Sequence, residues 1–384
     1  MTMNAYITGA CDTQVGELPQ SSCMGLHAEA AFGAIRDAGL EPGDIDGVLC
    51  AYSFTEPHLM LGSVFCEYAG IHPNFCTAIQ AGGASACIMI MQAAALVASG
   101  QCNHVLVVAG DNRLTGLSRD GAVAALSEVG HPQFERPFGI SVPASYALVA
   151  QRYMHDFGVA PEHLAAIAVE HRRHAGRHPK AHKREPISID DVLNSREICA
   201  PLRLLDCCLI SDGGAALVIS SRAGRGASPH RAVEILGAGQ GHTHEHIVAA
   251  PSLTDFGCKA SSARAFATAG VAPRDIDVAL IYDSFTITLL VELESIGFFA
   301  RGEAGPAALR GELGLGGALP CNTHGGLLSY GHSGAAGGMF HAVEAVHQLR
   351  GDAAGRQVNG ARLAFVHGDG GILSAHCSLV LGAA

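Results

Sequence analysis

The chain has 384 residues, 48% of them hydrophobic, which is enough to bury one large core or two fused ones. Its formal net charge of -11, from 24 basic and 35 acidic residues, disfavours binding to nucleic acid or to an anionic membrane. No apolar run is long enough to span a bilayer and no signal-like segment opens the sequence, so we expect a cytoplasmic protein. The 13 Cys show no repeated C-x-x-C spacing, which favours reduced, packed thiols over disulfides or zinc.

An internal repeat organises the sequence. Ala38–Phe54 (AGLEPGDIDGVLCAYSF) and Ala269–Phe285 (AGVAPRDIDVALIYDSF) match without a gap at about half their positions. In both copies a helix ends at Ala-Gly, a turn with Pro follows, and Asp-Ile-Asp leads into an apolar strand. This order predicts a layered α/β fold made of two related halves, residues 1–225 and 231–384.

The next elements repeat in the same order. Gly82–Gly100, a run of small and apolar residues, predicts a helix that leads into a strand at Val105–Ala109. Gly334–Gly351 and Leu363–His367 predict the same pair in the second half. We therefore expect two superposable halves, with a central pair of helices between two mixed sheets.

Late in each half, a glycine turn separates two apolar stretches. The turns are Ser211-Asp212-Gly213-Gly214 and Gly368-Asp369-Gly370-Gly371. Asp-Gly tolerates the positive φ that tight connections need, so both turns predict β-hairpins.

One segment, at about residues 111–204, has no counterpart in the second half. It is rich in His, Arg and Pro, and its pattern is that of polar helices and loops. We interpret it as an insertion carried on the first half. Long insertions on a scaffold often cover a substrate site.

A known family signature lies in the second half. Asn322–Gly338 (NTHGGLLSYGHSGAAGG) resembles the N-x-x-G-G-x-x-x-x-G-H-P-x-G-x-x-G signature of thiolases, with Ser333 in place of Pro. Ser211–Ser220 resembles their D-G-A-A-A segment, and Tyr282–Thr286 (YDSFT) stands where sterol-carrier-protein-like thiolases have H-D-C-F. The chain thus resembles the thiolase superfamily over nearly its whole length.

The resemblance implies a five-layer αβαβα fold that acts on acyl-CoA. It implies no tightly bound cofactor, with coenzyme A entering as part of the substrate. It also implies a homodimer, which we expect to pair through an edge strand of the first half near Val105–Ala109.

The glycines of this signature suit a site for a thioester. Gly325, Gly326 and the cluster at Gly334–Gly338 permit close approach of backbone N–H groups, which could stabilise an enolate oxygen. His332 would add a donor or a base. From the residues alone, a glycine-rich turn capped by a His is the simpler interpretation; with the resemblance, a site is favoured.

The nucleophile of thiolases is missing. Their Cys opens a C-x-S-G segment at the start of the buried helix, and Gly83 takes that position, two residues before Ser85. A glycine cannot form the acyl-enzyme of thiolysis, so Gly83 and Ser85 are expected only to shape the substrate site. Cys87 or Cys76 could replace the nucleophile if the alignment is shifted, and otherwise both are packed thiols.

Two further departures change the expected chemistry. His367 replaces the acid-base Cys of the C-x-G turn and can still transfer protons, and Gly370 of the same turn is expected in the substrate site. Tyr282 replaces the His of H-D-C-F. A related branch of the superfamily has Tyr at this position, lacks the Cys nucleophile and catalyses retro-aldol cleavage of β-hydroxyacyl-CoA. That branch works with a small DUF35 partner, with an OB fold and a zinc ribbon, and frequently has a second Tyr where this chain has His332.

The favoured hypothesis is therefore retro-aldol cleavage without a covalent intermediate. Tyr282, activated by His332, would be the base or its acid counterpart; His324, Asn322 and backbone N–H groups would hold the enolate. Tyr330 is a possible substitute for the second Tyr. Two alternatives stay open: an acetyl-CoA acetyltransferase that uses Cys87 or Cys76, and a non-catalytic acyl-CoA-binding subunit.

The remaining histidines carry weaker signals. His242, His244 and His246 alternate as metal ligands on one strand face would, but no metal belongs to the resemblance and none is expected. His171, His174 and His178, in the insertion, are expected on a solvated helix face.

Overall fold

The computed structural model describes residues 4–118, 121, 129–221 and 230–384. Nine strands form one mixed sheet in the order β3-β2-β4-β7-β1-β8-β11-β10-β9. Those of the first half are β1 (Tyr6–Asp12), β2 (Gly47–Ala51), β3 (Phe75–Ile79), β4 (His104–Asn112) and β7 (Asp212–Ser220). Those of the second half are β8 (Val233–His242), β9 (Val278–Ile281), β10 (Leu363–Gly370) and β11 (Ala375–Ala383).

The two halves mirror each other about the junction of β1 and β8. Read outward from that junction, the order β1-β7-β4-β2 corresponds to β8-β11-β10-β9. The sequence predicts two separate sheets. In the structure Tyr6 pairs with Glu234 and Ile7 with Val233, so pairing between β1 and β8 joins the strands of the two halves into one sheet. The predicted duplication is confirmed.

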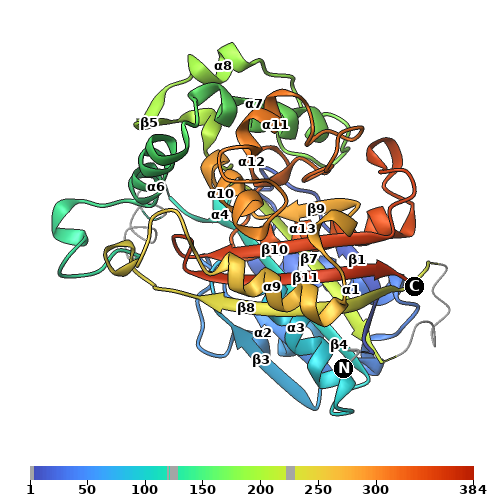
Figure 1. Cartoon of the computed structure of the whole chain (residues 1–384). Helices are drawn as coiled ribbons and strands as arrows, with labels where there is room; N and C mark the ends of the chain where they lie inside the picture. The colour runs from blue at the N-terminus through green and yellow to red at the C-terminus, as the bar shows by residue number, and fades with distance from the viewer. Residues whose placement is uncertain (1–3, 119–120, 122–128, 222–229) are drawn as a thin grey trace.

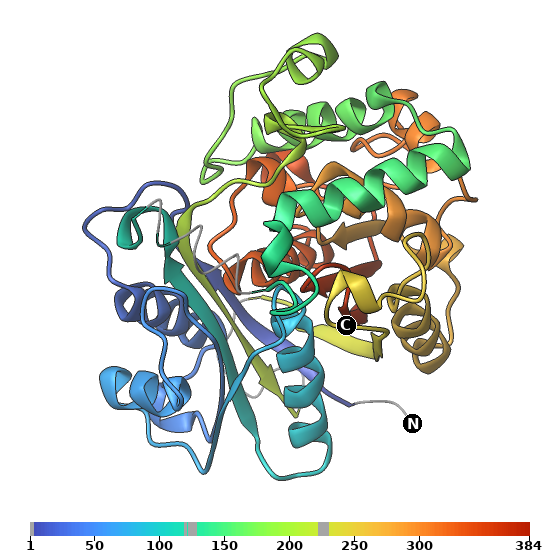
Figure 2. The same cartoon turned by 90° about the vertical axis from the view of Figure 1, so that its left-hand side faces the viewer.

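Helices supply the other layers (Figures 1 and 2). The central pair, α3 (Ser85–Ala98) and α13 (Ala336–Arg350), packs on strands of both halves. Outer helices α1 (Cys23–Asp37) and α2 (Leu61–Ala69) cover the first half, while α9 (Cys258–Ala269) and α10 (Thr286–Ile296) lie on the second. The residues of α3 are apolar on nearly every side, as suits a helix buried between the strands of the two halves. The expected αβαβα fold is confirmed.

The Asp-Ile-Asp repeat has a structural reason in both halves. Asp44 and Asp275 each accept an N–H from the residue three positions earlier at 2.8 Å, closing the turn before the strand. Asp46 accepts N–H groups where β4 begins, and Asp277 does the same where β10 begins. These carboxylates tie neighbouring strands together, which explains why both copies carry the same step.

The insertion begins with α4 (Arg113–Gly116) and continues with α6 (Val142–Phe157), α7 (Pro161–Ala175), α8 (Ile189–Leu193) and the strands β5 (Glu197–Cys199) and β6 (Leu202–Arg203). It packs on the other half of the molecule: α7 contacts α10, α11 (Ala304–Leu309) and α12 (Gly326–Ser329), as Figure 1 shows. The insertion of the first half therefore covers loops and helices of the second half. Short 3-10 helices complete the chain at Pro42–Asp44, Arg136–Phe138, Leu204–Asp206, Ile247–Ala249, Pro273–Asp275 and Ala354–Arg356.

The two predicted hairpins differ in outcome. The second hairpin is confirmed, because β10 and β11 pair around a turn at 371–374. The first is wrong: Asp212 already belongs to β7, whose partners are β1 and β4.

The edge strand expected for dimer contact is also wrong. Val105–Ala109 lies within β4, which pairs with β2 on one side and β7 on the other. The outer strand of the first half is β3. The expected domain boundary at residue 225 lies outside the described residues. Within the described ranges, no helix combines the length and apolarity needed to cross a membrane.

Candidate functional site

A cavity of about 300 Å³ lies where the two halves and the insertion meet. Its wall is mostly apolar, with Val142 and Leu204 from the insertion and Phe285 from the second half among its residues. Its polar residues include Arg113, Tyr282 and His332, which come from three distant parts of the chain. Such a mostly apolar hollow with a few converging polar groups is the usual form of a small-molecule site.

These three polar residues form a hydrogen-bonded chain with a defined direction. Arg113 donates from a guanidinium nitrogen to Nδ1 of His332 at 2.9 Å, and a guanidinium has no acceptor atom. Burial, followed by the charge of Arg113, lowers the pKa of His332 to about 3, so its ring is neutral. The proton of the ring is therefore on Nε2, which lies 2.7 Å from the Tyr282 hydroxyl and donates to it. The O–H of Tyr282 stays available for another acceptor.

Asn322 holds Tyr282 in place through the preceding residue. Its side-chain oxygen accepts the N–H of Ile281 at 2.8 Å, and its side-chain nitrogen donates to the Ile281 carbonyl at 2.7 Å. Both polar atoms of the Asn322 amide are therefore hydrogen-bonded to the last residue of β9, and the amide does not line the cavity. The ring of His341 stacks on that of Tyr282, with 6.2 Å between centroids. Burial raises the pKa of Tyr282 well above its ordinary value, so its resting form is the neutral phenol.

Gly83 and Tyr282 share one space. A Cβ at position 83 would lie 2.1 Å from Cζ of Tyr282 and 2.4 Å from the main-chain oxygen of Asp369. No side chain fits there while Tyr282 keeps its place. The two departures from the thiolase pattern are therefore linked, because the ring of Tyr282 fills the room that a Cys side chain would need.

The turn at Gly83 is built by its neighbours. Ser85 accepts the N–H of Ala81 at 2.9 Å and donates to the carbonyl of Gly82 at 2.7 Å, so it shapes the start of α3. A Cβ at Gly370 would lie 2.1 Å from the Ala81 carbonyl. The β10–β11 turn and the Gly82-Gly83 turn thus pack backbone against backbone.

Gly325 and Gly326 act at a distance from the cavity. Both have positive φ, 113° and 62°, and a Cβ at Gly326 would lie 2.1 Å from a carboxylate oxygen of Asp283. That carboxylate accepts the N–H of Leu327 at 2.8 Å, at the start of α12. These glycines let α12 approach Asp283, and neither lines the cavity.

His324 and Tyr330 lie behind the cavity wall. The His324 ring is 4.8 Å from that of His341 and 5.1 Å from that of Tyr330, and neither of its nitrogens has a hydrogen-bond partner among the described residues. Tyr330 donates its hydroxyl to Asp12. Neither residue lines the cavity, so the structure does not bring them to Tyr282.

His367 is part of a separate buried cluster. Its Nδ1 is 2.8 Å from the Ser378 hydroxyl, its Nε2 is 3.1 Å from Nδ1 of His376, and Glu292 lies 3.4 Å away. Burial lowers the pKa of His367 to about 3. Glu292, His367 and His376 are the one group of three potential metal ligands within the described ranges. The two imidazoles lie within hydrogen-bond distance of each other; His242, His244 and His246 form no such group.

The thiols that line the cavity are Cys207 and Cys208, which no sequence pattern indicated. Burial raises the pKa of Cys208 and of Cys87 to about 12, so both are protonated thiols. Cys87 does not line the cavity. Cys76 lies on β3, with its sulfur 3.7 Å from that of Cys66. Arg113 was also missed, although a charged residue directly after the buried strand β4 was a usable signal.

The expected solvated histidines are buried, so that prediction is wrong. Nδ1 of His171 lies 2.8 Å from Asp283, and Nδ1 of His174 lies 3.2 Å from the carbonyl of Asn322. His178 is 6% exposed and packs on Tyr330. These histidines are buried because α11 and α12 pack on α7. The sequence of the insertion alone cannot indicate this contact.

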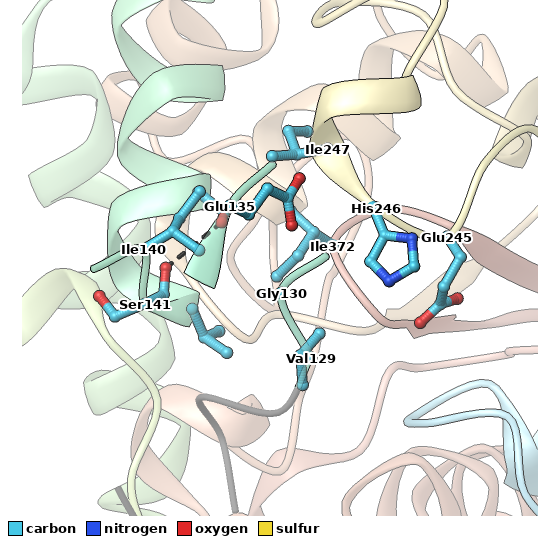
Figure 3. Close-up of a pocket in the computed structure, with 11 residues that line it drawn as sticks. Val129, Gly130, Glu135, Ile140, Ser141, Glu245, His246, Ile247 and Ile372 are labelled. Atoms are coloured by element: carbon cyan, nitrogen blue, oxygen red, sulfur yellow. Dashed lines mark hydrogen bonds between the residues drawn. The ribbon is translucent and has the colours of Figure 1, made fainter. Parts of the chain in front are cut away.

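A smaller pocket adjoins the cavity and shares Val129 and Val142 with it (Figure 3). Glu135 of the insertion faces the segment with Glu245 and His246, and its carboxylate accepts the N–H of Val248 at 2.7 Å. The loop after β8 is therefore fastened to the insertion at this side of the cavity.

A duplicated αβαβα fold with a cavity beside the start of a buried helix defines the thiolase class of architecture. The profile described as "Thiolase, N-terminal domain" matches residues 5–223, and "Thiolase C-terminal domain-like" matches residues 239–383. The chain belongs to the thiolase family.

Individual relatives agree with this assignment. The chain is 36% identical to a "Steroid side-chain-cleaving aldolase" of Thermomonospora curvata, covering 90% of each, and 32% identical to an "Acetyl-CoA acetyltransferase" of Methanothermobacter thermautotrophicus, covering 95% and 96%. The solved structure "Ltp2-ChsH2(DUF35) aldolase" superposes with a TM-score of 0.87 at 34% identity, over 100% of this chain and 98% of that one.

Proposed function

We propose that this protein is an enzyme that cleaves the Cα–Cβ bond of a β-hydroxyacyl-CoA by a retro-aldol reaction. The observation that carries the proposal is the Arg113–His332–Tyr282 chain in the cavity, with the ring of Tyr282 in the space of the missing nucleophile. The similarity to an aldolase over 90% of both chains supports it. No tightly bound cofactor takes part, and coenzyme A enters with the substrate.

The residues suit proton transfer better than covalent catalysis. Tyr282 accepts the proton of the β-hydroxyl and gives its own O–H proton to the α-carbon; the Cα–Cβ bond breaks, and its electron pair moves into the enolate of the thioester, which that proton neutralises, so Tyr282 is a neutral phenol before and after the step. The Nε2–H of His332 and the charge of Arg113 stabilise the negative charge that develops on the Tyr282 oxygen during the transfer. The products are a ketone or aldehyde and a shorter acyl-CoA. The apolar cavity wall favours a hydrophobic acyl group.

Partners are proposed by similarity. The aldolase structure with DUF35 in its title supports a small DUF35 partner, with an OB fold and a zinc ribbon, for this chain too. Asn322, Gly326 and His332 are positioning residues in this proposal, whereas Tyr282 acts on the substrate.

The second candidate is an acetyl-CoA acetyltransferase, favoured by the methanogen relative and by Cys207 and Cys208 in the cavity. Such an enzyme needs a thiolate nucleophile, and burial raises the pKa of Cys208 to about 12. A third candidate is a non-catalytic acyl-CoA-binding subunit. Such a subunit would not need the Arg113–His332–Tyr282 chain of hydrogen bonds.

The test uses the purified protein with a panel of β-hydroxyacyl-CoA thioesters. A retro-aldol enzyme should release a carbonyl compound and a shorter acyl-CoA without added free CoA, because no thiol attacks the substrate. Liquid chromatography with mass spectrometry measures both products, and intact-protein mass spectrometry should show no acyl adduct. Turnover only with free CoA, together with an adduct on Cys208, would establish the acetyltransferase instead.

The homodimer is also proposed, with a different edge strand. β3 is the outer strand of the first half, and its residues are intermediate or exposed, so its free backbone groups can pair with a second copy. Light scattering at micromolar concentration should give twice the 39.5 kDa of one chain. A mass of one chain would contradict the proposal.

A further inference from the structure

The group of three potential metal ligands lies in the interior of the second half. Glu292 comes from α10, His367 from β10 and His376 from β11. Each is at most 1% exposed, and none of them lines the cavity, so the group is separate from the hydrogen-bonded chain that contains Tyr282. The ligands come from three elements and have no regular spacing, which is why the sequence predicts no metal here.

The carboxyl group of Glu292 is buried without a partner. Neither of its oxygens has a hydrogen-bond partner among the described residues. Oε1 lies 3.4 Å from Nε2 of His367 and 3.7 Å from Nδ1 of His376. A second carboxylate oxygen without a partner in the described ranges, Oδ1 of Asp369, lies 3.9 Å from Nδ1 of His376. Burying polar groups without partners is costly, so two such carboxyl groups beside the same imidazole point to a bound cation.

The outer hydrogen bonds of the two rings leave lone pairs on the inner nitrogens. Nε2 of His376 donates to the carbonyl of Leu373 at 2.9 Å, so the lone pair of the neutral ring is on Nδ1. Nδ1 of His367 can donate to the Ser378 hydroxyl at 2.8 Å, and Ser378 can donate to the Ser261 hydroxyl at 2.9 Å. Ser261 in turn donates to a carbonyl of α9 at 3.0 Å. In this direction the lone pair of His367 is on Nε2, which faces Nδ1 of His376.

The opposite direction satisfies fewer groups. If Nε2 of His367 donated to Nδ1 of His376, 3.1 Å away, both rings would be satisfied, but Glu292 would keep two buried oxygens without a donor. A cation between the three ligand atoms gives all three residues a partner at once. Histidines that bind a metal commonly donate their other N–H to a carbonyl or another oxygen, and both rings have such an oxygen here.

The spacing of the ligand atoms fits a zinc ion. Zinc binds imidazole nitrogen and carboxylate oxygen at about 2.0–2.2 Å in a tetrahedral arrangement, which places neighbouring ligand atoms about 3.4 Å apart. The three separations here are 3.1, 3.4 and 3.7 Å. Calcium and magnesium prefer a larger set of oxygen ligands and suit two imidazoles poorly.

We propose that Glu292, His367 and His376 form a structural zinc site. The ion would join α10, which begins shortly after Tyr282, to the β10–β11 hairpin, whose turn packs on the turn at Gly83. It would thus hold together two segments on either side of Tyr282 without taking part in the reaction. Because the ligands are buried, the ion would bind as the chain folds. The site does not depend on the proposed function.

Metal analysis of the whole chain tests this site. The protein is produced with added Zn²⁺ and dialysed against EDTA, which removes ions from its surface, and the zinc content is measured by inductively coupled plasma mass spectrometry. The parent should keep about one zinc ion per chain, because a buried ion exchanges slowly. Glu292→Gln and His376→Ala each remove one ligand and should keep less than about a tenth of that amount.

His27→Ala is the matched control for His376→Ala. His27 is also a fully buried histidine with a ring nitrogen bonded to a carbonyl, that of Cys23 at 2.9 Å, but it is not in the group of three. The variant should keep zinc at the parent level, whatever it does to stability. His242→Ala, which removes an exposed imidazole at the end of β8, should also keep it.

X-ray absorption at the zinc edge needs only the parent protein, so it decides the ligands even if the variants do not fold. The proposed site should give nitrogen and oxygen ligands at about 2.0–2.2 Å, with the outer scattering of two imidazoles. Sulfur ligands at about 2.3 Å would place the ion on thiols and would overturn the inference. A parent without zinc, zinc at the parent level in both Glu292→Gln and His376→Ala, or loss of zinc in His242→Ala would overturn it as well.

Discussion

Replacing Tyr282 with Phe should lower kcat for cleavage of a β-hydroxyacyl-CoA by about a hundredfold or more. The change removes one oxygen atom and leaves the ring that fills the space beside Gly83, so the packing of the cavity wall stays as it is. What it removes is the acceptor of the Nε2–H of His332 and the only group of the Arg113 chain that can exchange a proton with the substrate. Steady-state assays of the shorter acyl-CoA measure the effect.

Tyr330→Phe is the matched control. Tyr330 is also a buried tyrosine with one hydrogen bond, to Asp12, but it does not line the cavity. It should therefore change kcat little, whatever it does to stability. Cys87→Ala should likewise be almost silent. Equal losses from Tyr330→Phe and Tyr282→Phe would mean that the assay reports on the fold rather than on chemistry at Tyr282.

Much of the site could be predicted because family signatures fix positions along the chain. Gly83, Tyr282 and His332 are 199 and 50 residues apart in sequence, yet each signature placed its residue at the same cavity. The duplicated fold followed from one repeat, whose aspartates have the same backbone partners in both halves. The family signatures and the aspartate repeat can be recognised in the sequence because both depend on local backbone geometry.

The direction of a side chain could not be predicted in the same way. Asn322, His324 and Tyr330 lie in the same signature as His332, but the left-handed backbone at Asn322 and the glycine turn aim them at Ile281, His341 and Asp12. The spacing of residues within a glycine-rich turn does not determine the direction in which each side chain points.

Contacts between distant segments were missed for a related reason. Arg113 and Tyr146 belong to the insertion, whose position over the second half depends on how α6 and α7 pack against α10 and α12. Asp369 was seen only as part of a turn. The raised pKa of its carboxyl group depends on burial and on the neighbouring carboxyl of Glu292, which is 77 residues away in the sequence.

The second large effect is expected at Gly83. Gly83→Ala adds a single methyl group, but that group would lie 2.1 Å from Cζ of Tyr282 and 2.4 Å from the Asp369 carbonyl. The first contact requires the ring to move, and the second is with backbone, which cannot yield cheaply. Overpacking of this kind costs about 1–3 kcal/mol of the free energy of unfolding, and a displaced Tyr282 should lower kcat by about a hundredfold. Thermal unfolding and the cleavage assay measure the two effects.

Gly355→Ala is the matched control for Gly83→Ala, since nothing lies within 4 Å of the added methyl group. It should leave both stability and kcat near the values of the parent. Gly83→Cys is a further variant. It restores the residue type of a thiolase at that position while the ring of Tyr282 still fills the space. It should gain no thiolysis with free CoA and should be as unstable as Gly83→Ala. If Gly83→Ala is instead as stable and as active as the parent, Tyr282 can move aside freely, and the loss of the nucleophile and the gain of the tyrosine are independent events.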